Sequence, residues 1–323
     1  MYNLEKLFKG YISIISENGE YTFERFTKKQ FEIIEKEEYA VKKHTRGNAN
    51  LIMEFVTKKD EISFDFRVVS YLIEKKLANF DIYENDVFYE TKRFEEGIEK
   101  GTLRYKKRNK GATKITIYFM CSMNLALSNF DLGEVEYFEK KKKNYLALGD
   151  SITQGYTSDR PSMSYVSVVA RHFDLNCLNL GIGGYNQNPE ILDKEINFDA
   201  DVITIAFGVN DSSCVFREEI TFDDLKNFFK GYYDKITEFY PNAKINVITP
   251  IWCEMDLVKQ RYYEHLVKLR EFIKEEAGKR GFNVIDGLKM VPNSFDYYEP
   301  DGLHPNAEGF MHYAVNLIKE IKV

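Results

Sequence analysis

From residue 144 onward, short apolar runs alternate with longer amphipathic stretches, and this rhythm constrains the fold more than any other feature of the sequence. The apolar runs have the length of buried strands, and the stretches between them have the apolar spacing of helices. Such alternation indicates a parallel sheet covered on both faces. The predicted strands are 145–148, 175–180, 201–207, 244–248 and 283–285, and the predicted helices are 165–172, 222–240, 257–280 and 306–321.

The first 138 residues have a different pattern. Short runs rich in Phe, Tyr, Val and Ile are separated by turn-forming residues, and helical signals are weak. Examples of these runs are 62–69, 86–89 and 115–120. The pattern predicts an all-β, jelly-roll-like sandwich over residues 1–138.

The length of the chain favours two domains, because 323 residues exceed what one hydrophobic core usually organises. We expect a Lys-rich junction at 139–143, followed by a second domain over 144–323. The lysines of the junction are equally compatible with the polar start of a strand.

The net charge of −6 is divided unevenly, with +3 on residues 1–143 and −9 on residues 144–323. Neither half is basic enough for a nucleic-acid footprint, so we expect no nucleic-acid partner. One basic cluster, 104–110, is followed by Gly111. A solvated hairpin turn explains this cluster, and the alternative is a site for an anionic partner.

Four widely separated cysteines form no CxxC pair. This spacing argues against a zinc site and a disulfide scaffold, and it favours buried thiols in a reducing compartment. Residues 1–10 show no apolar segment of a secretory signal, and no apolar run approaches the roughly 18 residues of a membrane span. We therefore expect a cytoplasmic protein without a membrane partner or a metal site.

Polar residues with catalytic potential follow the predicted strands. Ser151 comes after the first strand, Gly184 after the second and Asn210 after the third. Asp301 and His304 share the last loop. Because the carboxyl ends of parallel strands meet at one edge of a sheet, we expect these residues to gather there.

Ester hydrolysis needs a nucleophile, a base and donors aimed at the developing oxyanion, and this set supplies all three. Ser151 would attack, His304 would take its proton, and Asp301 would hold the imidazole in the productive tautomer. The oxyanion would be bound by the backbone N–H groups of Ser151 and Gly184 and by the side-chain amide of Asn210.

Structural roles are the alternative for each of these positions. Ser151 could serve only as a helix N-cap, and Gly184 only as a turn glycine. Asn210 and Asp211 could form an Asx turn. Asp150 is expected to fasten its own loop through hydrogen bonds.

Other candidate residues lie outside these blocks. Trp252 follows the strand 244–248, so it either packs in the core or forms a platform that lines the substrate site. The remaining histidines are expected to be structural; they are His44, His172, His265 and His312.

Four sequence blocks resemble those of the SGNH (GDSL-type) hydrolase superfamily. They are Gly149-Asp150-Ser151-Ile152, NLGIGG with Gly184, GVND with Asn210, and DGLHP with Asp301 and His304. The blocks occur in the family's order over residues 144–323. The resemblance implies a flavodoxin-like three-layer α/β/α sandwich and hydrolysis of esters or thioesters without a metal or an organic cofactor. It implies the same catalytic and oxyanion roles as those given above.

A β-sandwich ahead of such a hydrolase domain is similar to the arrangement in family 2 carbohydrate esterases, which remove acetyl groups from sugars. Some of those enzymes lack the orienting carboxylate, whereas this sequence retains Asp301. We expect a serine esterase for short acyl esters, acting on O-acetyl groups of a small-molecule or oligosaccharide substrate. The alternatives are a thioesterase or lysophospholipase and a non-catalytic carbohydrate-binding protein. The absence of a GxSxG motif argues against an α/β-hydrolase. The sequence does not predict the oligomeric state.

Overall fold

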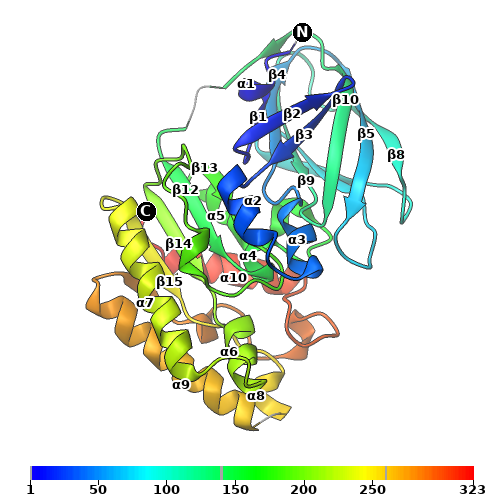
Figure 1. Cartoon of the computed structure of the whole chain (residues 1–323). Helices are drawn as coiled ribbons and strands as arrows, with labels where there is room; N and C mark the ends of the chain where they lie inside the picture. Colours follow the sequence, from blue (N-terminus) through cyan, green and yellow to red (C-terminus); the bar gives the residue numbers. More distant parts are fainter. Residues whose placement is uncertain (1, 139–140, 259) are drawn as a thin grey trace.

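The computed structural model describes residues 2–138, 141–258 and 260–323, and its strands form three sheets (Figure 1). Two sheets are antiparallel and lie in the N-terminal part, residues 2–138. The first contains, in sheet order, β1 (Phe8–Lys9), β4 (Ile52–Thr57), β9 (Thr113–Phe119), β6 (Asn79–Glu84) and β7 (Val87–Arg93), with β11 (Val135–Glu136) paired to β4. The second contains β2 (Ser13–Glu17), β3 (Glu20–Glu24), β10 (Met123–Asp131), β5 (Glu61–Tyr71) and β8 (Lys100–Lys106).

The two antiparallel sheets share one hydrophobic core. In β5 the side chains of Ile62, Phe64 and Phe66 are buried, and the residues between them are more exposed, as the two-residue period of a strand requires. Phe64 packs edge-to-face on Phe80 of β6, in the other sheet, with ring centroids 6.1 Å apart. Ring contacts of this kind explain why the N-terminal part is rich in phenylalanine.

The third sheet is parallel and lies in the C-terminal part, residues 141–323. In sheet order its strands are β13 (Asn176–Asn179), β12 (Asn144–Gly149), β14 (Val202–Ala206), β15 (Lys244–Ile248) and β16 (Asn283–Ile285). Numbered along the chain, this is the order 2-1-3-4-5 of flavodoxin-like sheets. The direction of winding reverses at β12 and β14, which is where sheets of this kind bind ligands. The sequence predicted these five strands to within about one residue.

Helices lie on both sides of the parallel sheet (Figure 1). Their buried apolar side chains form two hydrophobic clusters with those of the sheet. Leu146 and Leu148 of β12 belong to the cluster that contains α7 (Phe222–Phe239) and α9 (Gln260–Lys279). Tyr145 and Ala147, which alternate with them, face α5 (Tyr165–His172) and α10 (Ala307–Glu320). Because successive side chains of a strand point to opposite faces, the two clusters lie on opposite sides of the sheet.

The remaining helices are α1 (Leu4–Leu7), α2 (Lys28–Ile34), α3 (Tyr39–Thr45), α4 (Ser151–Gln154), α6 (Val209–Phe216) and α8 (Met255–Val258). The predicted helix 257–280 corresponds to the end of α8 and to α9, with Lys259 outside the described residues. Of the predicted junction 139–143, Glu139 and Lys140 also lie outside them. Among the helices of the described residues, none combines the length and the hydrophobicity needed to cross a membrane.

The basic segment 104–110 is not a hairpin turn, so this expectation was wrong. β8 pairs with β5, whereas β9 pairs with β4 and β6, so the chain between them crosses from one antiparallel sheet to the other. Lys107 is buried in this crossing, and its Nζ donates to the carbonyl O of Thr57 at 2.9 Å and of Gly111 at 2.6 Å. Lys107 thus holds the connection between β8 and β9 against the end of β4.

Helices α2 and α3 were not predicted, and they lie where the antiparallel sheets meet the parallel sheet (Figure 1). A capping box starts α2: Thr27 Oγ1 accepts the Gln30 N–H at 3.2 Å, and Gln30 Oε1 accepts the Thr27 N–H at 2.9 Å. The same residues reach the C-terminal part, because Thr27 Oγ1 donates to Asp193 Oδ2 at 2.6 Å and Gln30 Nε2 donates to the Ile191 carbonyl at 2.8 Å. The capping box therefore both starts α2 and holds this helix against the C-terminal part.

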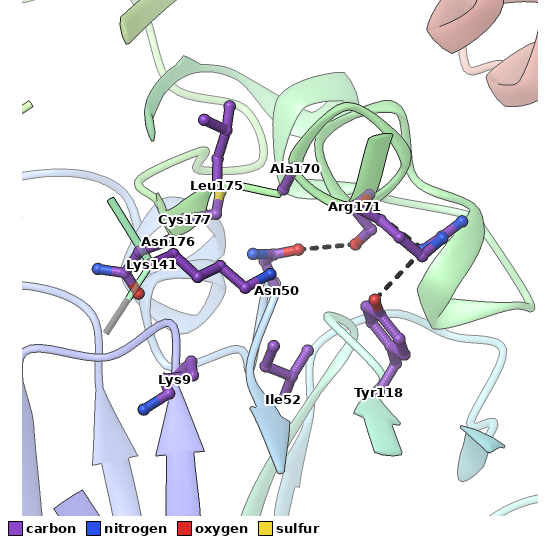
Figure 2. A pocket seen from close by; sticks show the side chains of 11 residues that line it. Lys9, Asn50, Ile52, Tyr118, Lys141, Ala170, Arg171, Leu175, Asn176 and Cys177 are labelled. Carbon is purple, nitrogen blue, oxygen red and sulfur yellow. Dashed lines mark hydrogen bonds between the residues drawn. The ribbon is translucent and has the colours of Figure 1, made fainter. Parts of the chain in front are cut away.

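The two parts of the chain also meet at α5. Figure 2 shows Asn50 and Tyr118 reaching toward this helix around a cavity of ≈ 20 Å³, which has room for about one water molecule. Ser167 Oγ donates to Asn50 Oδ1 at 2.8 Å, and Arg171 Nη1 donates to the Tyr118 hydroxyl at 3.3 Å. These hydrogen bonds hold the antiparallel sheets against α5.

Candidate active site

Ser151 is the first residue of α4, and only Asp150 separates it from the end of β12. Asp150 is the N-cap of this helix, because its Oδ1 accepts the Ile152 N–H at 3.1 Å. The Ser151 side chain is therefore not the cap, and Asp150 fastens the loop as the sequence predicted. The Oγ of Ser151 lies 2.8 Å from Nε2 of His304.

His304 and Asp301 lie on the loop ahead of α10. Nδ1 of His304 lies 2.6 Å from Oδ2 of Asp301, whose Oδ1 accepts the backbone N–H groups of Leu303 and His304 at 2.9 and 3.0 Å. Burial raises the pKa of Asp301, but the hydrogen bonds from the His304 side chain and from these N–H groups outweigh burial and lower the pKa to about 2. An ionised Asp301 thus orients the imidazole so that Nε2 faces Ser151.

The glycine-rich segment after β13 folds onto α4. Asn179 Oδ1 accepts the Gly181 N–H at 2.8 Å, and Gln154 Oε1 accepts the Gly183 N–H at 2.7 Å. Gly184 is exposed and has φ = +75°, a conformation that glycine adopts without strain. A side chain of α4, that of Gln154, therefore positions the segment that carries Gly184.

The GVND block spans the N-cap and first turn of α6, and its two polar side chains bind the residues after Gly184. Asn210 Nδ2 donates to the Tyr185 carbonyl at 3.2 Å, across 25 residues, and Asp211 Oδ1 accepts the Gln187 N–H at 2.8 Å, across 24. These long-range contacts replace the local Asx turn that was the alternative. A primary amide has two N–H donors, so Asn210 retains one for a further acceptor.

Two carboxyl groups beside the site are fully buried. Burial raises the pKa of Asp150 to about 6 and that of Asp211 to about 7. Hydrogen bonds from the backbone N–H groups of Ile152 and Gln187 oppose these shifts, and the nearby Asp150 adds to the shift at Asp211. Asp211 therefore changes protonation near neutral pH.

Arg25, from the N-terminal part, holds the glycine-rich segment, and sequence reasoning missed it. Only 1 % of its surface is exposed. Nη1 donates to the carbonyls of Asn179 at 2.5 Å and Gly181 at 3.2 Å, and Nε donates to the Gly47 carbonyl at 2.7 Å. Burial lowers the pKa of Arg25 to about 9, so the guanidinium stays charged at neutral pH. A single arginine after a strand forms no sequence pattern that would predict its contact with the glycine-rich segment.

His44 is a second N-terminal residue at the site. Its carbonyl accepts Gln154 Nε2 at 2.8 Å, and its ring lies edge-on to that of Tyr156, with centroids 5.5 Å apart. The Tyr156 ring in turn packs on His304, with centroids 4.6 Å apart. Burial, followed by the charge of Lys43, lowers the pKa of His44 to about 4, so its ring is neutral. These contacts fit the structural role that was expected for His44. The sequence did not indicate that His44 lies beside the catalytic candidates.

Trp252 is 5 % exposed and belongs to the apolar cluster that contains side chains of α5 and α10. Its ring is edge-on to Phe295 and Tyr298, with centroids 5.6 and 5.0 Å apart. These contacts favour the packing role of Trp252 over that of a platform for substrate.

A serine, a histidine and an aspartate joined by hydrogen bonds at the end of a parallel strand are the arrangement that serine hydrolases use. Residues 147–311 match the sequence model of the GDSL-like Lipase/Acylhydrolase family, and the chain belongs to this family. The resemblance to SGNH hydrolases is thereby confirmed. No curated protein matches the chain.

Solved structures of low sequence identity share the fold. The salicylyl-acyltransferase SsfX3 from a tetracycline biosynthetic pathway has a TM-score of 0.79 at 17% identity, over 97% of this chain and 93% of that one. A putative GDSL-like lipase from Bacteroides ovatus has a TM-score of 0.71 at 19% identity, over 98% and 96%. A family two carbohydrate esterase from Clostridium thermocellum, in complex with cellohexaose, has a TM-score of 0.63 at 15% identity, over 84% and 91%.

Proposed function

We propose that the protein is a serine esterase that removes short acyl groups, chiefly O-acetyl groups of carbohydrates, through a Ser151–His304–Asp301 triad and an acyl-enzyme. One observation carries the proposal: Ser151 Oγ lies 2.8 Å from His304 Nε2, while His304 Nδ1 lies 2.6 Å from Asp301 Oδ2. The two contacts use both ring nitrogens, as a general base with an orienting carboxylate requires.

In the proposed mechanism, His304 Nε2 takes the proton of Ser151 Oγ as the oxygen attacks the acyl carbon. The N–H groups of Ser151 and Gly184 and the second amide proton of Asn210 donate to the resulting oxyanion. His304 then protonates the leaving alcohol, and the acyl group stays on Ser151. Attack by water, with His304 again as the base, releases the acid and restores the serine.

The preference for carbohydrate acetyl esters rests on the proteins of like fold. Family two carbohydrate esterases are among the proteins of like fold, and one of them is described with a bound cello-oligosaccharide. In this proposal residues 144–323 form a flavodoxin-like three-layer domain, and residues 1–138 form a jelly-roll-like sandwich. The shared core of the antiparallel sheets and the two clusters on the parallel sheet support that division.

Turnover of p-nitrophenyl acetate tests the proposal. Ser151→Ala should lower kcat/KM by on the order of a thousandfold or more. The matched control is Ser16→Ala, on the exposed edge strand β2, which should retain full activity. A fluorophosphonate should label Ser151 in the wild type. Unchanged turnover in Ser151→Ala would contradict the proposal, and absence of labelling would favour the non-catalytic carbohydrate-binding alternative.

A screen of acetylated mono- and oligosaccharides for acetate release then identifies the natural ester. A series of acyl chain lengths separates an acetylesterase from a thioesterase or lysophospholipase. Preference for long acyl chains would reverse the assignment.

A further inference from the structure

Tyr156 contacts both members of the proposed serine–histidine pair. Its ring packs on the ring of His304, with the centroids 4.6 Å apart and the ring planes inclined by 46°. Its backbone N–H donates to the carbonyl O of Ser151 at 2.9 Å. Tyr156 therefore reaches the proposed nucleophile through its backbone and the proposed base through its side chain.

A sharp turn after α4 brings Tyr156 to this position. The helix ends after one turn at its C-cap, Gly155, which has φ = +89°, a conformation that glycine adopts without strain. A Cβ on Gly155 would lie 2.9 Å from Cβ of Ser164, so a larger residue would force a shift. Sγ of Cys121, from the N-terminal part, donates to the Gly155 carbonyl at 3.0 Å. The turn is thus fixed by its own backbone and by the N-terminal part.

The next residue, Thr157, has a backbone conformation that is rare for its type. Its φ of +74° lies in the left-handed region, which a β-branched residue enters only under strain. Its hydroxyl lies within hydrogen-bond reach of the carbonyls of Tyr156 and Pro305, the latter at 3.2 Å, and Pro305 directly follows His304. Such strain persists only where surrounding contacts impose it, and it is common at functional sites. Thr157 therefore fixes the turn against the loop that carries the proposed base.

Two hydrogen bonds do not by themselves fix the His304 ring. Ser151 and Asp301 meet its two nitrogens, which lie at the edge of the ring. Contacts at the edge leave the ring free to tilt about the line that joins the two nitrogens, whereas a flat side chain on the ring stops that rotation. A tilt matters because a reacting group displaced by about 1 Å can slow a reaction about a hundredfold.

The Tyr156 ring is itself held by the N-terminal part. The ring of His44, from α3, meets it edge-on, with centroids 5.5 Å apart. Burial lowers the pKa of His44 to about 4. Burial, followed by the negative charges of Asp301 and Glu74, raises the pKa of Tyr156. Both rings are therefore uncharged at neutral pH, and their contacts are contacts of packing.

We propose that Tyr156 is a positioning residue whose ring holds the His304 imidazole in its catalytic orientation. His44 and Thr157 in turn hold Tyr156. This inference rests on the proposed esterase function, and it gives the N-terminal part a role at the proposed base as well as at the glycine-rich segment. Because His304 acts in both acyl-transfer steps, loss of its alignment slows both steps and leaves KM unchanged.

Hydrolysis of p-nitrophenyl acetate by the full-length protein tests the role of the ring. Tyr156→Leu keeps a large apolar side chain but removes the flat ring, so it should lower kcat at least about tenfold while KM stays within about twofold. Tyr156→Phe keeps the ring and should retain kcat within about twofold. The matched control is Tyr240→Leu. Tyr240 is also half-buried, but it precedes β15, at the edge of the parallel sheet opposite Ser151, so this variant should keep wild-type kcat.

Proton NMR gives a second readout, which does not require turnover. An imidazole N–H that donates to a carboxylate resonates far downfield, and loss of the signal in His304→Gln assigns it. Tyr156→Phe and Tyr240→Leu should keep this signal. Tyr156→Leu should broaden it, because a ring that tilts exposes its N–H to exchange with water.

An unchanged kcat or an unchanged downfield signal in Tyr156→Leu would overturn the inference. So would an equal loss of kcat in Tyr156→Phe, which would assign the effect to the hydroxyl. If Tyr156→Leu does not fold, Thr157→Gly decides. It relieves the backbone strain, so Tm should change little, but it frees the turn from Pro305 and should lower kcat roughly fivefold. Full kcat in Thr157→Gly would contradict the inference.

The two readouts separate this inference from the proposed function. If the wild type lacks Ser151-dependent turnover, the proposed function fails, and the downfield signal alone then decides whether Tyr156 orients His304. If turnover depends on Ser151 but Tyr156→Leu changes neither readout, the esterase function stands and the inference fails.

Discussion

The guanidinium of Arg25 donates from Nη1 to the carbonyl O of Asn179 at 2.5 Å, and this contact joins the N-terminal antiparallel part to the segment that carries Gly184. Arg25 directly follows β3, and Asn179 is the last residue of β13. The same nitrogen reaches the Gly181 carbonyl at 3.2 Å. Because these carbonyls lie within five residues of Gly184, the antiparallel sheets help to shape the proposed oxyanion site.

Arg25→Met should weaken both the fold and the catalysis. Buried carbonyls would lose a charged donor, so we expect a loss of about 3 kcal/mol in the free energy of unfolding. Displacement of the Gly184 segment should lower kcat for p-nitrophenyl acetate roughly a hundredfold. Urea unfolding and steady-state kinetics measure the two effects. Arg67→Met, which removes an exposed pair with Glu20, is the control and should cost less than about 1 kcal/mol.

Asp301→Asn tests how strongly catalysis by His304 depends on the carboxylate of Asp301. The amide cannot hold the imidazole in the same tautomer, so kcat should fall by on the order of a thousandfold or more while the fold is retained. Asp296→Asn, exposed on the same loop, should keep its activity. A fall of less than tenfold would instead identify a Ser151–His304 dyad.

Asp211 should make stability depend on pH. Its pKa of about 7 in the folded protein lies above the unfolded value of 3.8, so the folded state binds more protons between these two values. Stability should therefore fall as pH rises from about 4 to about 7. Asp211→Asn keeps an acceptor for the Gln187 N–H and should flatten that decline, with the remainder attributable to Asp150. Thermal unfolding at pH 4.5, 6 and 8 measures the slope, and equal slopes in both proteins would refute the assignment.

Gly183→Ala should disturb the contact with His44. An added Cβ would lie 2.8 Å from Cγ of His44, which is too close for two carbon atoms, so α3 or the glycine-rich segment must shift. We expect a loss of about 1–3 kcal/mol and at least a tenfold fall in kcat. The contrasting variant is Gly278→Ala in α9, where no atom lies within 4 Å of the added Cβ. It should stabilise the protein by about 0.5–1 kcal/mol in thermal unfolding.

Much of the secondary structure in the C-terminal part follows from local sequence pattern. Side-chain periodicity and turn chemistry act over a few residues, so the sequence could predict the strands of the parallel sheet, the helices α5, α7 and α10 and the four blocks of polar residues. Ser151 and His304 could be paired before the structure because parallel strands end at a common edge. Thr27 and Gln30 have the spacing of a capping box, so the start of α2 could also have been predicted, but it was not.

The remaining features depend on contacts between distant segments of the chain. The crossing at 104–110 depends on which sheet each flanking strand joins, and a strand's own residues do not specify its partner. Arg25 and His44 lie beside residues more than 100 positions away, so no local pattern marks them. Local sequence pattern was enough to predict the parallel sheet and the polar residues that follow its strands. The burial of Arg25 between the two parts exists only because distant segments exclude water from the same space.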